Sequence, residues 1–365
     1  MSRRPPDYAV MVSVFTLLLL GLVMVFSSSS VRAYVEFGDS YYFFKRQLAW
    51  VILGLGTMLV LMKVDYWDVR RYARPFFLVA LLLLVIVLIP GLGRTAGGAR
   101  RWIGYGSLGF QPSELMKLAI VVYMSWALTR VPGRVKDFVR GVLPYVLLMG
   151  VVFALVLKQP DLGTAVAIGG TVMVMIFLAG ARLGHLAGLA AAAVPLVFAA
   201  MWGEEYRRRR FLAFLDPFAD PQGSGFHIIQ ALYALGSGRL FGVGLGDSRQ
   251  KYLYLPAEHT DFIFAIIGEE LGFVGGLLVL GLFLVLAWRG YRTAMTAPDA
   301  FSSLLAAGVT TMIVFQATVN IGVVCGVLPI TGIPLPLVSF GGSSLIFTLA
   351  GVGMLLNISR YCSER

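Results

Sequence analysis

The sequence has few of the residues that build soluble domains and metal sites. Only 13% of its 365 residues are charged, and it contains two cysteines and three histidines. A soluble globular domain carries about 25% charged residues. Cys325 and Cys362 provide no disulfide framework, and His185, His227 and His259 lack the spacing of zinc ligands. These shortages argue against a disulfide-rich fold, a zinc site and an ordinary soluble domain.

Hydrophobic residues make up 58% of the chain and form long blocks with almost no charge. In hydrocarbon, every backbone polar group must be satisfied within its own segment, so such blocks predict membrane-spanning helices. We expect an all-α integral membrane protein, a single polytopic domain over residues 1–365 with about ten transmembrane helices. The predicted spans are residues 8–29, 47–63, 76–91, 113–129, 141–157, 164–180, 184–202, 261–287, 302–324 and 342–358.

The net charge of +11 is explained in part by membrane topology. Under the positive-inside rule, basic short loops that alternate with ten spans place both termini in the cytoplasm. The basic residues of these loops are Arg3, Arg4, Arg70, Arg71, Arg74, Arg130, Arg134, Lys136, Arg140, Arg182, Arg289, Arg292 and Arg360. Nucleic-acid binding would require a basic soluble domain, and the sequence has none, so we expect no nucleic-acid partner.

The other basic residues concentrate in residues 203–260, which we predict to be one long extracytoplasmic loop. It contains Arg207 to Arg210, Arg239, Arg249 and Lys251. Long loops cross the membrane largely regardless of charge, which permits this patch without explaining it. A cationic patch on the outer face suggests a polyanionic ligand such as a lipid pyrophosphate. The alternative is that the arginine run contacts lipid headgroups.

Two acidic residues mark the span that follows this loop. Asp261 lies at its outer mouth, and Glu269 lies about 12 Å further along the helix on nearly the same side. Ionisable groups at membrane depth are expensive and are functional candidates by default. The alternatives are that Asp261 caps the helix and that Glu269 pairs with a polar group inside the bundle.

Two shorter motifs combine helix boundaries with charge. Glu114 and Lys117 are three residues apart at a helix start, so they share a face and can pair. Lys117 could contact phosphate while Glu114 tunes it, or the two could form a structural ion pair. Lys158 and Asp161 flank a break between two spans, and such a polar break fits a cavity wall better than a lipid-facing surface.

Two glycine-rich segments need separate interpretations. Residues 236–246 resemble a nucleotide-binding loop, but no strand precedes them and no GxxxxGK[ST] motif occurs, so a nucleotide site is excluded. Their glycines instead favour a re-entrant loop that packs closely. Residues 328–344, which include Ser339, are rich in proline and glycine and must be shielded inside the protein. A rigid structural turn is the favoured interpretation of this segment.

Six motifs occur in an order that resembles the SEDS family (shape, elongation, division and sporulation proteins), the bacterial membrane enzymes that polymerise peptidoglycan. The motifs are RWI, FQPSELMK, QPDLGT, FLDPFADP, LPAEHTDFIFAIIGEELG and LPITGIPLPLVSFGGSS. The resemblance covers nearly the whole chain. The loop over residues 236–251 is more similar to the division (FtsW-type) branch than to the rod-elongation (RodA-type) branch.

The resemblance implies a glycosyltransferase that joins lipid II disaccharide units on the outer face of the membrane. It implies that Asp261 is catalytic, and a carboxylate there can accept the proton of an attacking sugar hydroxyl. The residues expected to bind substrate or pyrophosphate are Arg101, Glu114, Lys117, Lys158, Asp161, Arg207, Arg210 and Lys251. Glu269 and Ser339 are expected to support the site. No metal ligands are predicted, although a divalent cation such as magnesium could assist.

The resemblance also implies partners and a location. The family works with a class B penicillin-binding transpeptidase and with other division proteins in the bacterial cytoplasmic membrane. For the division branch, the expected location is the septum.

Three other functions stay open: a lipid II flippase, a scaffold that only recruits the transpeptidase, and a rod-elongation polymerase. A flippase would need polar residues throughout the bilayer depth, whereas the sequence concentrates them at the outer mouth.

Overall fold

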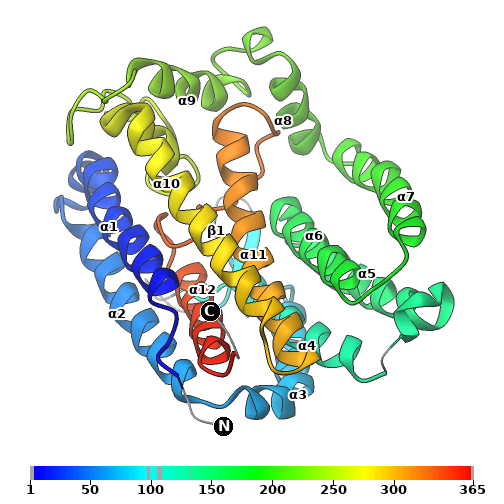
Figure 1. The fold of residues 1–365 in the computed structure, drawn as a ribbon. Helices are drawn as coiled ribbons and strands as arrows, with labels where there is room; N and C mark the ends of the chain where they lie inside the picture. Colours follow the sequence, from blue (N-terminus) through cyan, green and yellow to red (C-terminus); the bar gives the residue numbers. More distant parts are fainter. Residues whose placement is uncertain (1–3, 97–98, 105–108, 132, 363–365) are drawn as a thin grey trace.

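The computed structural model describes residues 4–96, 99–104, 109–131 and 133–362, and this part of the chain is mostly helical (Figure 1). A helix occurs at each of the ten predicted spans, so the all-α prediction is confirmed. These helices are α1 (Tyr8–Phe37), α2 (Tyr42–Lys63), α3 (Tyr66–Ile86), α4 (Pro112–Thr129), α5 (Leu143–Leu157), α6 (Leu162–Leu178), α7 (Leu183–Trp202), α10 (Ile263–Met295), α11 (Ala300–Val324) and α12 (Gly342–Ser359). Arg3, counted with the first basic loop, lies outside the described residues.

Seven helices of the described chain are long and apolar enough to cross a membrane. They are α1, α2, the helix over Phe138–Leu157 that contains α5, α7, α10, α11 and α12. α6 is apolar but has only 17 residues. α3 and α4 carry charged residues, and in α4 the charges of Glu114 and Lys117 are buried inside the protein. Charge that faces protein is compatible with a spanning helix.

Shorter elements connect these helices. The predicted long loop, residues 203–260, contains α8 (Glu205–Leu215), η3 (Pro217–Ala219) and α9 (Phe226–Ser237). An antiparallel hairpin of β1 (Arg94–Ala96) and β2 (Ala99–Trp102) joins α3 to α4. The short helices η1 (Arg134–Lys136) and η2 (Phe138–Val142) precede α5.

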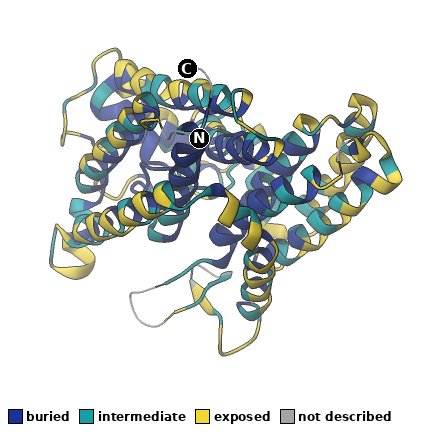
Figure 2. Cartoon of the chain, turned by 60° about the horizontal axis from the view of Figure 1, so that its bottom comes forward, coloured by how far each residue is buried: buried dark blue, intermediate teal, exposed yellow. Residues whose placement is uncertain are grey.

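The core lies between α1, α2, α4, α10, α11 and α12, where the buried residues gather (Figure 2). Glycines bring α2 and α12 close together, since a Cβ atom on Gly353 would lie 2.6 Å from the carbonyl oxygen of Met58. Small residues commonly permit this approach between membrane helices. α7 lies at the edge of the bundle and has no buried residue, as expected for a helix that faces lipid (Figure 1).

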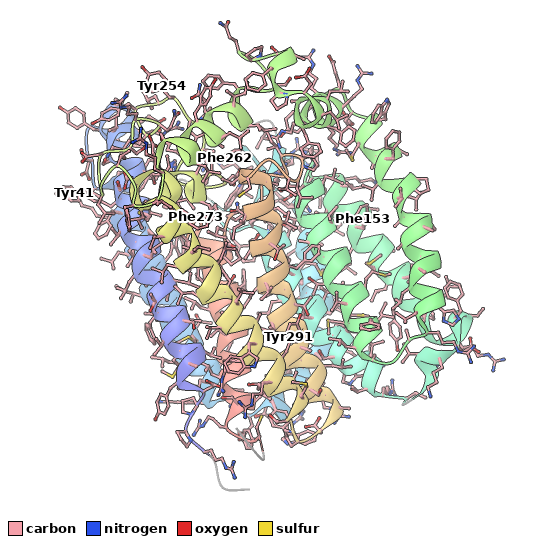
Figure 3. The ribbon with its side chains drawn as sticks, turned by 45° about the horizontal axis from the view of Figure 1, so that its top comes forward. Tyr41, Phe153, Tyr254, Phe262, Phe273 and Tyr291 are labelled. Carbon is pink, nitrogen blue, oxygen red and sulfur yellow. The ribbon has the colours of Figure 1, made fainter. Side chains whose placement is uncertain are left out.

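The two ends of the bundle are distinguished by their contacts. α10 begins just after Asp261 and reaches Tyr291 near its other end (Figure 3). α11 returns to the Asp261 end, where the Asn320 side chain donates a hydrogen bond to the Asp261 carbonyl at 2.8 Å. Cys325 follows α11 at that end, whereas the Cys362 thiol donates to the Thr293 carbonyl at the opposite end. The two cysteines therefore cannot form a disulfide within one molecule.

The helix α10 is broken at Gly272, whose φ of 68° and ψ of −166° are not helical. The glycine-rich loop between α9 and residue 246 fills the break, and it packs as closely as its glycine content predicts. Four hydrogen bonds join them: Val243 N to Glu269 O at 3.0 Å, Gly244 N to Glu270 O at 3.2 Å, Phe273 N to Arg239 O at 2.9 Å, and Val274 N to Leu240 O at 3.1 Å. The loop thus satisfies backbone groups that the break leaves without partners.

Candidate active site

The backbone around Asp261 is fixed by the proline- and glycine-rich segment before α12 and by α11. The carbonyl groups of residues 259–261 accept hydrogen bonds from three donors. Phe340 N donates to the first at 2.9 Å, Ser339 Oγ to the second at 2.6 Å, and Asn320 Nδ2 to the third at 2.8 Å. The segment is therefore rigid, as its composition suggests, and its rigidity positions Asp261.

The Asp261 side chain does not cap α10 in this structure. The N-cap residue of α10 is Phe262, and no side-chain capping hydrogen bond is present there. The carboxylate instead faces two adjoining cavities. Burial raises the pKa of Asp261 to about 6, while Arg210 acts in the opposite direction. A carboxylate with this pKa is ionised at neutral pH and is a stronger base than an ordinary aspartate.

The first cavity has a volume of about 270 Å³ and is cationic. Arg101, Arg207 and Arg210 line it together with Asp261, and we call it the arginine cavity. Two of these arginines come from one face of α8, since positions three apart share a helix face. Gly332 lies between Asp261 and Arg210, and its φ of 73° disfavours other residues. The buried Thr331 hydroxyl lines this cavity without a partner in the described chain.

The second cavity has a volume of about 240 Å³ and shares Arg101, Asp261 and Gly332 with the first. We call it the polar cavity, because Gln111, Glu114, Asp161, Thr164, Ser343 and Ser344 also line it. Asp161 caps α6 by accepting from Thr164 N at 3.1 Å and lies 3.8 Å from an Arg101 guanidinium nitrogen. Asp261 thus stands at the junction of a cationic cavity and one that combines hydroxyl and amide groups with Arg101 and the carboxylates of Glu114 and Asp161.

Lys117 lies buried behind Glu114 and does not line either cavity. Its ammonium group is 2.8 Å from the Glu114 carboxylate and donates to Gln316 Oε1 at 2.5 Å. The predicted ion pair is therefore present. Through Glu114, Lys117 balances charge at the wall of the polar cavity.

Lys158 and Lys251 are not brought to the cavities. Lys158 lies at the C-terminal end of α5, and neither residue is among those lining the arginine or polar cavity. Lys251 instead donates to the Gly246 carbonyl and lies 3.7 Å from Glu270. Its loop packs against α10, and the ammonium group is held by these two partners. The structure therefore gives no support to the prediction that these two lysines contact substrate.

Glu269 does not line the cavities beside Asp261, although it lies on nearly the same side of the predicted helix. Its carboxylate accepts hydrogen bonds from Ser248 Oγ at 2.5 Å and from Arg249 N at 3.0 Å. It therefore holds the loop before Asp261, a supporting contact.

Asn320 and Ser344 were not singled out from the sequence. Asn320 carried a usable signal, because a polar side chain at membrane depth is a functional candidate.

The carboxylates of the site do not form a preorganised metal centre. No group of three or more His, Cys, Asp or Glu side chains among the described residues is placed to hold a metal ion. Glu114 is paired with Lys117, and Asp161 lies beside Arg101. The donor set therefore does not fit a resident magnesium ion, and we derive the chemistry from the arginines and Asp261.

Comparison with known proteins identifies the family of this chain. The chain is 47% identical over 360 residues to stage V sporulation protein E of Bacillus subtilis, covering 99% of this chain and 98% of that protein. It is 45% identical over 353 residues to the probable peptidoglycan glycosyltransferase FtsW of Geobacter metallireducens, covering 97% and 94%. It matches a chain of a solved peptidoglycan synthase complex with a TM-score of 0.79 and 36% identity, covering 97% and 98%. The family model FtsW/RodA/SpoVE, described as cell cycle protein, matches residues 8–364. The chain therefore belongs to the FtsW/RodA/SpoVE family of cell cycle proteins, the SEDS family that its motifs resemble.

Proposed function

We propose that this protein is a peptidoglycan glycosyltransferase that polymerises lipid II, with Asp261 as its general base. The observation that carries the proposal is the position of Asp261 between the arginine cavity and the polar cavity. Relatives named as peptidoglycan glycosyltransferases support it. The direct test is conversion of purified lipid II into glycan strands by the isolated protein.

The reaction follows from what each cavity offers. A sugar hydroxyl of the acceptor lies in the polar cavity and loses its proton to the Asp261 carboxylate as its oxygen attacks the anomeric carbon of the donor. The bond from that carbon to the pyrophosphate breaks, and the electron pair leaves with the pyrophosphate. Arg101, Arg207 and Arg210 stabilise the departing charge. One displacement inverts the anomeric carbon, so an α-linked donor gives a β-linked product.

The flippase alternative fits the cavities less well. The arginine and polar cavities both adjoin Asp261 at one end of the bundle. At the opposite end, the cavity between Asp7 and Arg289 holds only about 10 Å³. A transport path would need polar space along the whole depth of the bundle. If the protein were only a scaffold, neither the raised pKa of Asp261 nor the arginines around it would have a function.

The distribution of basic loops supports chemistry outside the cytoplasm. The two ends of the described chain meet at the end of the bundle opposite Asp261, where Arg4 N donates to the Arg360 carbonyl and where Asp7, Arg289 and Arg292 line one small cavity. The other short basic loops lie at the same end (Figure 1). The positive-inside rule puts that end in the cytoplasm of the bacterium and Asp261 on the outer face of the cytoplasmic membrane. The substrate then meets the site only after it has been transferred across the bilayer.

This topology predicts selective labelling of Cys325. Cys325 is exposed at the Asp261 end, whereas Cys362 is 4% exposed at the other end. A membrane-impermeant maleimide added to intact cells should therefore modify the protein, and Cys325→Ser should abolish the modification. Modification of Cys325 only after the membrane is disrupted would contradict the assigned topology.

The partner and cellular role follow from the relatives. The solved complex that the chain resembles coordinates polymerization and crosslinking. A class B penicillin-binding transpeptidase is therefore the partner that we propose, with the wider set of division proteins. The names FtsW and stage V sporulation protein E favour septal or sporulation wall synthesis over rod elongation.

The pH dependence of the reaction should report the state of Asp261. Burial raises the pKa of its carboxyl group to about 6, and a general base must be unprotonated. We expect kcat/KM for lipid II to rise with pH, to break near pH 6, and to level off above it. The measurement is initial polymerisation rates at subsaturating lipid II from about pH 5 to about pH 8. Rates that stay level down to about pH 5, or that still rise above about pH 7, would contradict a general base with this pKa.

A further inference from the structure

Four helices direct their N-termini toward the polar cavity: α4, α6, α10 and α12. The residues that line it include Gln111 and Glu114 at the start of α4, Asp161 and Thr164 at α6, Asp261 before α10, and Gly341, Ser343 and Ser344 at α12. The first N–H groups of a helix have no partner within it. Together with the helix dipole, they make each N-terminus attractive to anions.

Three of these four N-termini already have a carboxylate from the protein. Glu114 lies in the first turn of α4, Asp161 is the N-cap of α6, and Asp261 immediately precedes the N-cap of α10. α12 differs, because its N-cap is Gly341, no side chain caps it, and its first turn has no acidic residue. The positive end of α12 is thus left for an anion that the protein does not provide.

Ser344 supplies a second, independent indication of a ligand. Its side chain is 8% exposed, lines the polar cavity, and its hydroxyl has no hydrogen-bond partner within the described residues. A buried hydroxyl without a partner is unfavourable, so such a group calls for a ligand. The neighbouring Ser343 hydroxyl accepts from Gln111 N at 3.1 Å and keeps its own proton to donate.

The N-terminus of α12 also separates two different environments. Gly341 lines the polar cavity and also a third cavity of about 610 Å³, which we call the aromatic cavity. The rings that line the aromatic cavity are Phe37, Tyr42, Trp50, Trp102 and Phe340, and the side chains of Arg46 and Arg94 line it as well. Gly342 lies against Trp50, since a Cβ atom there would be 2.4 Å from the indole ring. A molecule with a sugar on one side of a diphosphate and hydrocarbon on the other would place its phosphates at this boundary.

We propose that the N-terminus of α12, residues 341–344, binds a phosphate group of a polyprenyl-diphosphate-linked sugar in the polar cavity. The proposal rests on the glycosyltransferase function and adds a diphosphate site built from glycine and serine. The arginine cavity holds the diphosphate that leaves from the donor. The α12 site therefore serves the second substrate, the one whose hydroxyl attacks. The segment read from the sequence as a rigid turn thus also binds substrate.

Substitution of Ser344 separates binding from folding. Ser344→Asp puts a carboxylate where the phosphate would lie, and should raise KM for lipid II roughly tenfold to hundredfold. This carboxylate gains from the helix dipole, but it is buried in a cavity that already holds three carboxylates, so the melting temperature is measured to show that the variant is folded. Ser344→Ala removes only the hydroxyl and should raise KM by up to about tenfold. Ser40→Asp is the matched control, because Ser40 precedes α2 at the same end and lines none of the three cavities.

Binding of undecaprenyl diphosphate, which carries no sugar to transfer, makes the test independent of catalysis. Because the arginine cavity also holds this diphosphate, the number of bound molecules is measured: we expect the wild type and Ser40→Asp to bind two, and Ser344→Asp to lose the one at α12. If Ser344→Asp binds undecaprenyl diphosphate and uses lipid II as the wild type does, the α12 site is wrong, and polymerisation by the wild type still supports the glycosyltransferase. If binding depends on Ser344 but the wild type makes no glycan, the anion site stands and the proposed function fails.

Discussion

Asp261→Asn is expected to reduce lipid II polymerisation by about 10²–10⁴-fold, the usual cost of losing a general base. An amide has nearly the size of a carboxylate but cannot accept the proton of an attacking hydroxyl. The measurement is glycan formed per minute by purified protein. Asp247→Asn makes the same chemical change in an exposed loop away from both cavities and should polymerise normally. Glu269→Gln should be milder than Asp261→Asn, because Glu269 holds the loop rather than facing the cavities.

The stability of Asp261→Asn distinguishes a base from a structural residue. A carboxyl group whose pKa is raised on folding binds its proton more tightly in the folded state. Its contribution to stability is full below the unfolded pKa and is lost as pH rises through about 6. Asparagine does not ionise, so Asp261→Asn should melt at the same or a higher temperature than the wild type at neutral pH. Low activity together with a clearly lower melting temperature would instead indicate a structural role.

Arg210→Ala should lower kcat/KM for lipid II by roughly tenfold to hundredfold, with Arg207→Ala similar. Each of these residues lines the arginine cavity, and loss of one charge-assisted phosphate contact costs about 1.5–3 kcal/mol. Arg208 and Arg209 are exposed on the same helix and line neither cavity. Arg208→Ala and Arg209→Ala remove the same charge from α8 and should have little effect.

These four variants decide between two interpretations of the arginine run. If the run served only to attract lipid headgroups, the four substitutions would lower activity about equally, since each removes one charge near the membrane surface. A pattern confined to Arg207 and Arg210 would support a substrate contact. The purified proteins should be compared at fixed ionic strength, because exposed charges are screened by salt.

The sequence was sufficient to predict the helices and to single out Asp261 as a candidate, because both depend on local patterns. Long apolar blocks locate spanning helices, and an acid at the start of one is visible without a structure. Helix ends were less predictable. α3 begins at Tyr66 rather than at the predicted residue 76, because its first turns carry charged residues and Pro75 lies inside the helix.

The partners of loop side chains could not be predicted, because they depend on how distant segments pack. Lys251 resembles a phosphate ligand in sequence, but its loop lies against the broken helix α10 and directs it to Gly246 and Glu270. The role of Ser344 depends on three other helices meeting at the same cavity. No local sequence pattern predicts that these helices meet at one cavity.

The central claim is that this chain makes glycosidic bonds, and purified protein in detergent micelles with lipid II tests it most directly. Micelles present no bilayer to cross, so a flippase or a scaffold yields no product there. The assay should be run alone and with the transpeptidase partner, whose catalytic serine is blocked. We predict glycan strands of many disaccharides from the wild type, and almost none from Asp261→Asn. Folded wild-type protein that makes no glycan in either preparation, or Asp261→Asn that polymerises at the wild-type rate, would contradict the account.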